Sequence, residues 1–150
     1  MMKFLGVYLA VLLGLSMSGA SHATTKADAT RIYNKLVALS GVGRPLLVFS
    51  SDQNINAYSS SDSVIVTQGM LNITNNAELA LVIGHELGHI AHGDPYSSKS
   101  AEYAADKYGA QLISKAGYNV CYAARLFIKL GYPEGKTHPS DISRYRRLGC

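Results

Sequence analysis

The sequence has few of the features that mark several other classes of protein. It contains two cysteines in 150 residues, and it has neither an internal repeat nor a low-complexity segment. The net charge is only +4 with neutral histidines, and no dense basic patch indicates a nucleic-acid partner. Beyond the first two dozen residues, no apolar run is long enough to span a bilayer. The length and the ordinary apolar fraction of 47% therefore fit one soluble globular domain.

The N-terminal residues differ in composition from the rest of the chain. A positively charged start precedes an apolar run from Phe4 to Leu15, and small residues follow as far as Ala23. This order is typical of a secretory signal peptide, so we expect residues 1–23 to be removed, with Ala20 as a second choice of cleavage site. A retained membrane anchor is the alternative, but the run falls short of the roughly 20 residues that a span needs. We expect the mature domain, residues 24–150, to be periplasmic or secreted.

The two cysteines, Cys121 and Cys150, form an even pair in a chain that we expect to be exported. Such a pair favours a disulfide. Closing a loop of about thirty residues stabilises a small domain by roughly 3 to 4 kcal/mol. Two unpaired thiols are the alternative.

The spacing of apolar residues predicts a mainly helical α+β fold. Two short runs rich in β-branched residues, Leu46 to Phe49 and Val64 to Thr67, are predicted strands. The segment between them is too short to carry a crossover helix, so we expect a small antiparallel sheet. Helices are predicted over residues 29–39, 76–92, 98–116, 122–130 and 139–148.

The helix expected over residues 76–92 is apolar nearly all round, which places it in the core. Asn75 and Glu78 resemble a capping box at its start. Gly84 and Gly88 lie one turn apart, and each costs about 1 kcal/mol relative to alanine in a helix interior. A bare face of this kind indicates close approach by a neighbouring helix or by substrate.

The candidate chemistry lies on the same helix, in the segment His85-Glu86-Leu87-Gly88-His89. Two histidines four residues apart share one helix face, with a carboxylate beside them. Burying these groups costs several kcal/mol unless something satisfies them. A single zinc ion would bind both imidazoles and leave Glu86 to act as the general base. A chance match, or a helix with satisfied core histidines, is the alternative.

A catalytic zinc site needs a third protein ligand. If the chain turns at residues 93–97, Glu102 faces His89 in a helical pair, and Asp106 lies one turn further on the same face. We predict Glu102 as the ligand and Asp106 as the carboxylate that holds a ligand histidine by its second nitrogen. The alternatives are Asp106 as the ligand, in partial resemblance to the deuterolysin pattern, and a solvated acidic helix face.

The chain resembles the HtpX, BepA, LoiP and CAAX prenyl protease family of gluzincin metallopeptidases. The resemblance extends from about Asn56 to Leu148, most of the mature chain. Its motifs occur in order: Asn56-Ala57-Tyr58, the strand Val64 to Thr67, the helix Glu78 to His92, Glu102, Ala105-Asp106, Gly109, Ala116-Gly117-Tyr118, and Thr137-His138-Pro139 followed by Arg144.

The resemblance implies a zincin-like fold with one zinc ion per chain. The implied zinc ligands are His85, His89 and Glu102, with Glu86 as the base and Asp106 as a supporting carboxylate.

The same resemblance implies roles for two residues near the C-terminus. His138 comes near the zinc, where it stabilises the oxyanion or occupies the open position, and Arg144 orients that segment or binds a carbonyl or carboxylate. Only twelve residues separate His89 from Glu102, whereas many relatives have a long insertion there. Membrane spans and a C-terminal repeat domain found in relatives are also missing, so we expect a minimal soluble member.

The expected function is a zinc-dependent endopeptidase that cleaves unfolded or flexible extracytoplasmic proteins, in envelope protein quality control. We expect the substrate to lie extended along one predicted strand, since pairing at a sheet edge makes few demands on substrate sequence. The residues of this expected substrate strand are Val64, Ile65, Val66 and Thr67. One alternative is a zinc-stabilised periplasmic binding protein or chaperone without turnover. Another is a hydrolase of a different amide bond, such as that of a cell-wall peptide.

Overall fold

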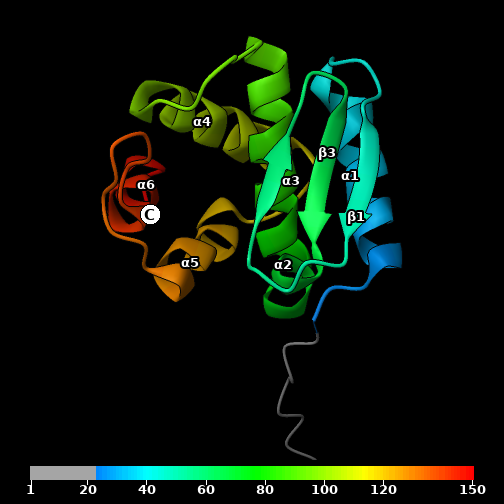
Figure 1. Ribbon diagram of the computed structural model, residues 1–150, viewed down its shortest axis with the longest axis horizontal. Helices are drawn as coiled ribbons and strands as arrows, with labels where there is room; N and C mark the ends of the chain where they lie inside the picture. The colour runs from blue at the N-terminus through cyan, green and yellow to red at the C-terminus, as the bar shows by residue number, and fades with distance from the viewer. Residues whose placement is uncertain (1–22) are drawn as a thin grey trace, which may run out of the picture.

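A computed structural model describes residues 23–150, so the expected signal peptide lies outside the described residues except for Ala23. In Figure 1, a small sheet lies to one side of the central helix α3, and helices α5 and α6 lie to the other. None of the helices in the described part of the chain is both long and apolar enough to cross a membrane. The helices are α1 (Lys26–Ser40), α2 (Gln68–Ile73), α3 (Asn76–His92), α4 (Lys99–Lys115), α5 (Val120–Leu130) and α6 (Asp141–Arg147), and the strands are β1 (Leu46–Ser50), β2 (Ala57–Ser59) and β3 (Ser63–Thr67).

The five predicted helices are all present, and the α+β class is confirmed. Helix α3 has the predicted bounds because local signals fix both ends. The Asn75 side chain accepts hydrogen bonds from the backbone N–H groups of Ala77 and Glu78, and the Glu78 carboxylate accepts one from the Asn75 N–H. Gly93 ends the helix with φ 64°, a conformation that glycine adopts at little cost. Helix α2 was not predicted, because six residues are too few to show a period.

The prediction of an antiparallel sheet is wrong for one pair of strands. The strand order is β1-β3-β2, in which β1 and β3 are parallel and β2 and β3 are antiparallel. The three-residue strand β2 was not predicted. It lies at the edge of the sheet opposite β1, and the chain then turns back so that β3 lies between β1 and β2. The parallel pair therefore needs no crossover helix.

This topology also overturns the expected substrate strand. Its residues, Val64, Ile65, Val66 and Thr67, belong to β3, which pairs with a neighbour on both sides and has no free edge. Ile65, for example, lies between Val48 of β1 and Tyr58 of β2. Val64 and Val66 are fully buried in the core. Among residues 23–150, the sheet edge on the side of α3 that pairs with no other strand is that of β2.

Helix α3 is buried, and its closest neighbour is α4. A Cβ built on Gly109 of α4 would lie 2.8 Å from the backbone nitrogen of His85, and one built on Gly88 would lie 3.0 Å from the Cα atom of Ala105. Gly84 faces Gly109 in the same way. The bare face predicted on α3 is thus a contact with a neighbouring helix. It brings the backbones of α3 and α4 close enough for their polar side chains to share one site.

The two cysteines are joined by a disulfide, as expected, with Cα atoms 5.3 Å apart. Cys121 lies in the first turn of α5, and Cys150 follows α6. The bond therefore ties the segment that follows α6 to α5.

Candidate metal centre

Three side chains from α3 and α4 converge on one point. The Nε2 atoms of His85 and His89 are 3.0 Å apart. The Glu102 carboxylate oxygens lie 3.4 Å from His85 Nε2 and 3.5 Å from His89 Nε2. Ligands about 2.0 to 2.2 Å from a tetrahedral zinc ion are about 3.3 to 3.5 Å from one another. The two distances from Glu102 match this spacing, and the two histidine nitrogens are about 0.3 Å closer together. The three residues have the chemistry of a metal centre, and their ligand atoms lie within 4.8 Å of one another.

Each histidine is oriented by a carboxylate on its other nitrogen. His85 Nδ1 is 2.8 Å from Asp106 Oδ1, and His89 Nδ1 is 3.0 Å from Asp94 Oδ2. Each carboxylate accepts a hydrogen bond from a protonated Nδ1, so each Nε2 lone pair is left free to face the metal position. Sequence analysis missed Asp94. Its signal was an acidic residue just past the end of the helix whose last turn carries His89.

Arg144 of α6 holds the Asp106 carboxylate with two hydrogen bonds. Its Nε and Nη2 atoms lie 2.8 and 2.7 Å from the two Asp106 oxygens. The Arg144 guanidinium also lies 4.4 Å from the ring centroid of Phe127 and 3.7 Å from Asp141 Oδ1. The carboxylate that Arg144 contacts most closely is therefore Asp106, the residue that orients His85.

The electrostatics follow from burial and these contacts. Burial lowers the pKa of His85, but the hydrogen bonds that its ring donates to the Asp106 and Glu102 carboxylates outweigh burial and raise that pKa to about 9. His89 behaves in the same direction, since the Glu102 contact overcomes burial and raises its pKa. Burial raises the pKa of Glu102, but the contacts with the two histidines lower this pKa by more than burial raises it, so the net shift is downward. The site attracts positive charge.

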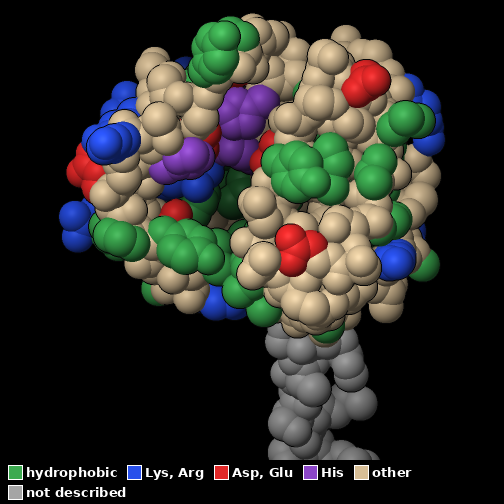
Figure 2. All heavy atoms as spheres, viewed as in Figure 1, with side chains coloured by type: hydrophobic (Ala, Val, Ile, Leu, Met, Phe, Trp, Pro, Cys, Tyr) green, Lys and Arg blue, Asp and Glu red, His purple; other side chains and the backbone are tan. Residues whose placement is uncertain are grey.

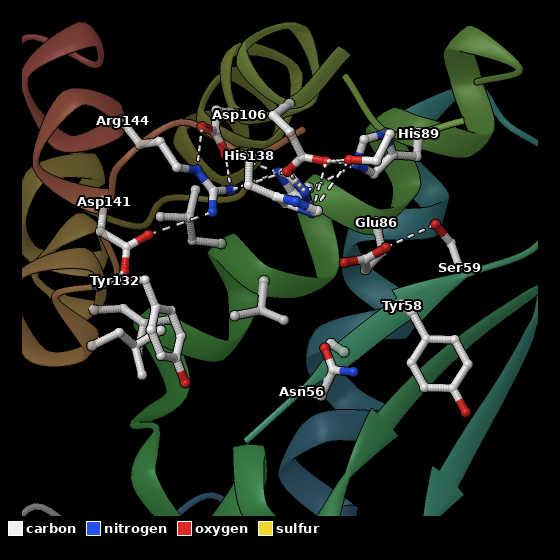
Figure 3. Close-up of a pocket in the computed structure, with 18 of the residues that line it drawn as sticks. Asn56, Tyr58, Ser59, Glu86, His89, Asp106, Tyr132, His138, Asp141 and Arg144 are labelled. Atoms are coloured by element: carbon white, nitrogen blue, oxygen red, sulfur yellow. Dashed lines mark hydrogen bonds and ion pairs between the residues drawn. The ribbon is translucent and has the colours of Figure 1, made fainter. Parts of the chain in front are cut away.

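Glu86 lies in α3 next to His85, and its side chain is buried. One of its oxygens, Oε2, accepts a hydrogen bond of 2.7 Å from Ser59 Oγ of β2. Figure 3 shows the other oxygen pointing away from Ser59. Glu86 is thus beside the metal donors without being among them.

His138 lies at the rim of the site in the loop between α5 and α6. Its side chain is 59% exposed, and its Nε2 atom is 3.6 Å from Glu102 Oε1 and 3.2 Å from Ser97 Oγ. The ends of the loop are held by Asp141 and Tyr132, which exchange backbone and side-chain hydrogen bonds. His138 is therefore held near the third donor, on the solvent side.

A cleft of about 430 Å³ opens beside these residues. The metal donors and Glu86 form one wall, and the residues of β2 line another. None of the residues expected to bind substrate, Val64, Ile65, Val66 and Thr67, lines the cleft. Figure 2 shows the histidines gathered at a hollow with apolar side chains within it. The apolar residues that line the cleft include Met70, Leu81, Val82, Leu126, Phe127 and Leu130.

Two histidines one helical turn apart, a glutamate beside them and a third carboxylate from the next helix define a site of the metallopeptidase class. The profile of Peptidase family M48 matches residues 23–101 and 95–149. The chain belongs to this family.

Proteins named "Protease HtpX homolog" are among its relatives. The chain is 27% identical to one from Verminephrobacter eiseniae over 137 residues, which cover 83% of this chain and 47% of the relative. It is 32% identical to one from Thermodesulfovibrio yellowstonii over 101 residues, which cover 62% and 36%. A third, from Thermoplasma volcanium, is 36% identical over 84 residues, which cover 49% and 27%. The chain thus spans less than half the length of these relatives.

Proposed function

We propose that the protein is an exported, zinc-dependent endopeptidase that cleaves unfolded or flexible extracytoplasmic proteins, in envelope protein quality control. The observation that carries this proposal is that the three donors and Glu86 face one open cleft. M48 membership supports a metal-dependent protease. His85, His89 and Glu102 would hold the zinc ion, with Asp106 and Asp94 fixing the two imidazoles.

When bound, the metal would polarise the substrate carbonyl and make a water molecule easier to deprotonate. Glu86 takes a proton from a water molecule as the water oxygen attacks the substrate carbonyl carbon. Glu86 then gives this proton to the departing amine nitrogen. His138 stabilises the negative charge on the former carbonyl oxygen from the rim of the cleft. Arg144 acts indirectly: it holds the Asp106 carboxylate, which in turn orients the ring of His85.

The free edge of β2 offers a place for the substrate backbone. One edge of β2 is paired with β3, while Ala57, Tyr58 and Ser59 all line the cleft. An extended peptide that pairs with this edge is held through its main chain, with little demand on its sequence. Such pairing requires an extended stretch of chain, which favours unfolded or flexible substrates over folded ones.

The apolar floor of the cleft suggests a preference at the cleavage site. Leu81, Leu126 and Phe127 are among the side chains that line the cleft together with the metal donors. An apolar substrate side chain placed there would lose contact with water, which favours binding. We therefore expect cleavage beside large apolar residues.

Export is supported by the composition of residues 1–23 and by the disulfide, which suits an oxidising compartment. Quality control is the process that broad cleavage of unfolded chains would serve there.

The test combines metal analysis with digestion of casein, an unstructured protein. The mature wild-type protein is expected to bind one zinc ion and to cleave casein, whereas Glu86→Gln is expected to keep the zinc and lose cleavage. Stoichiometric zinc and binding of unfolded clients without turnover by the wild type would favour a chaperone-like protein. Cleavage of cell-wall peptides but not casein would favour an amidase.

A further inference from the structure

A serine on the edge strand β2 contacts the proposed general base. Ser59 Oγ donates a hydrogen bond of 2.7 Å to Glu86 Oε2, across 27 residues of sequence (Figure 3). Among the described residues, no other side chain makes a hydrogen bond or ion pair with the Glu86 carboxylate. The orientation of this carboxylate therefore depends on one hydroxyl group.

The position of Ser59 follows from the alternation of side chains along β2. Tyr58 points to solvent and is 50% exposed, whereas Ala57 and Ser59 are partly buried and point to the other face of the strand, toward α3. Ser59 pairs with Val64 of β3 through one edge of the strand. Its other edge borders the cleft, so the residue that contacts Glu86 belongs to the strand along which the substrate is proposed to lie.

A glutamate side chain has several rotatable bonds, and a hydrogen bond to one oxygen restricts where the other oxygen points. With Oε2 held by Ser59, the second oxygen of Glu86 points away from β2 (Figure 3). We propose that Ser59 is a positioning residue. It holds Glu86 in the orientation that takes the proton from water, and it links this orientation to the strand that places the substrate carbonyl.

This inference rests on the proposed function, and it makes a separate prediction about kinetics. Ser59 touches the base and not the reacting atoms, so its loss affects the chemical step more than substrate binding. Ser59→Ala is expected to lower kcat about 10- to 100-fold, the size of a lost hydrogen bond to a charged group, while KM stays within about twofold. Ser59→Thr keeps a hydroxyl group and is expected to recover most of kcat.

The matched control is Ser61→Ala. Ser61 is exposed in the turn between β2 and β3, and its side chain makes no hydrogen bond to the described residues. This variant is expected to have wild-type kcat and KM. All four proteins are to be compared on one fluorogenic peptide at equal zinc content, so that metal loss does not contribute to the difference.

A second measurement needs no turnover. Crystal structures of the metal-free wild type and metal-free Ser59→Ala are expected to show one Glu86 carboxylate orientation in the former and several in the latter. An unchanged carboxylate position in Ser59→Ala overturns the proposal, as does an unchanged kcat or an equal loss in the Ala and Thr variants. If the zinc-loaded wild type cleaves nothing, the proposed function fails instead, and the carboxylate comparison still decides whether Ser59 orients Glu86.

Discussion

The contact between α3 and α4 sets the distance between the two histidines and Glu102, so a small widening of that contact is expected to weaken metal binding. Gly109→Ala is the sharpest perturbation. The added Cβ would lie 2.8 Å from the His85 nitrogen and 2.9 Å from the Gly84 carbonyl carbon, both backbone atoms of a buried helix. An ordinary contact is about 3.5 to 4.0 Å, so α4 must move away by roughly 0.7 to 1.2 Å.

A shift of that size affects the site more than the fold. The two distances from Glu102 to the histidine nitrogens, 3.4 and 3.5 Å, are set across this contact. Metal sites tolerate only about 0.2 Å in their ligand distances, so we expect zinc affinity to fall about 10- to 100-fold. Overpacking costs about 1 to 3 kcal/mol, and the better helix propensity of alanine offsets about 1 kcal/mol of this. The metal-free variant should therefore lose about 0 to 2 kcal/mol of folding free energy.

The assay is competition with a chromophoric chelator for zinc, together with urea unfolding of the metal-free protein. Gly43→Ala is the control, because a Cβ at that exposed glycine meets no atom within 4 Å and the backbone there does not have a positive φ. A Gly109→Ala protein that is more stable than wild type and binds zinc equally well would refute the reasoning. It would mean that helix propensity outweighs the close contact.

Asp106→Asn keeps the shape of the side chain but removes the charge that faces His85 and Arg144, so zinc affinity should fall about 10- to 100-fold by chelator competition. An unchanged affinity would contradict its orienting role. His138→Ala should lower kcat by about 100-fold with zinc retained if the ring stabilises the oxyanion, whereas a rise in kcat would show that it blocks the site. Cys150→Ser opens a disulfide between residues separated by 29 positions, and urea unfolding should show a loss of roughly 3 to 4 kcal/mol; a smaller loss would assign more of the stability to packing of α6. In the metal-free protein, burial lowers the pKa of His85 but its carboxylate contacts raise it from 6.5 to about 9, so this stabilisation is complete below pH 6.5 and is lost as the pH rises through 9. Tm should fall over that range, and a constant Tm would argue against the shift; the zinc-loaded protein should instead lose its metal in acid, because ligand histidines bind as neutral groups.

The helices and the paired histidines were predictable because their signals are local. Gly84 and Gly88 indicated close approach by a neighbouring helix or by substrate, and in the structure the neighbour is α4. Glu102 was within reach of inference because a short turn joins α3 to α4, and the residue pairs Gly84–Gly109 and Gly88–Ala105 run in opposite directions along the two helices.

The remaining features depend on contacts that no local pattern encodes. The strand β2 is three residues long, too short to show alternation, and without it the order of the sheet and the free edge could not be inferred. Ser59 meets Glu86 only because β2 packs beside α3. Roles for His138 and Arg144 came from the family resemblance alone, since they follow α5 and approach the site from the opposite side.

Charge explains why the fold tolerates so many buried acids at one place. Glu86, Glu102, Asp106 and Asp141 are each at most 6% exposed, and Arg144 is the only arginine or lysine that lines the cleft in the described part of the chain. Its shortest contacts are with Asp106, and it lies 3.7 Å from Asp141 and 3.9 Å from Glu102. Glu102 also contacts the two histidines, whereas the Glu86 carboxylate accepts a hydrogen bond from Ser59. Buried carboxylates are costly without a counter-charge. The raised pKa of His85 indicates that, in the metal-free state, a proton on this histidine supplies part of the counter-charge. A divalent ion between the same donors supplies more positive charge and needs neutral histidines. Metal binding should therefore stabilise the fold as well as complete the site, and the gain should grow as the pH rises through the range in which His85 loses its proton.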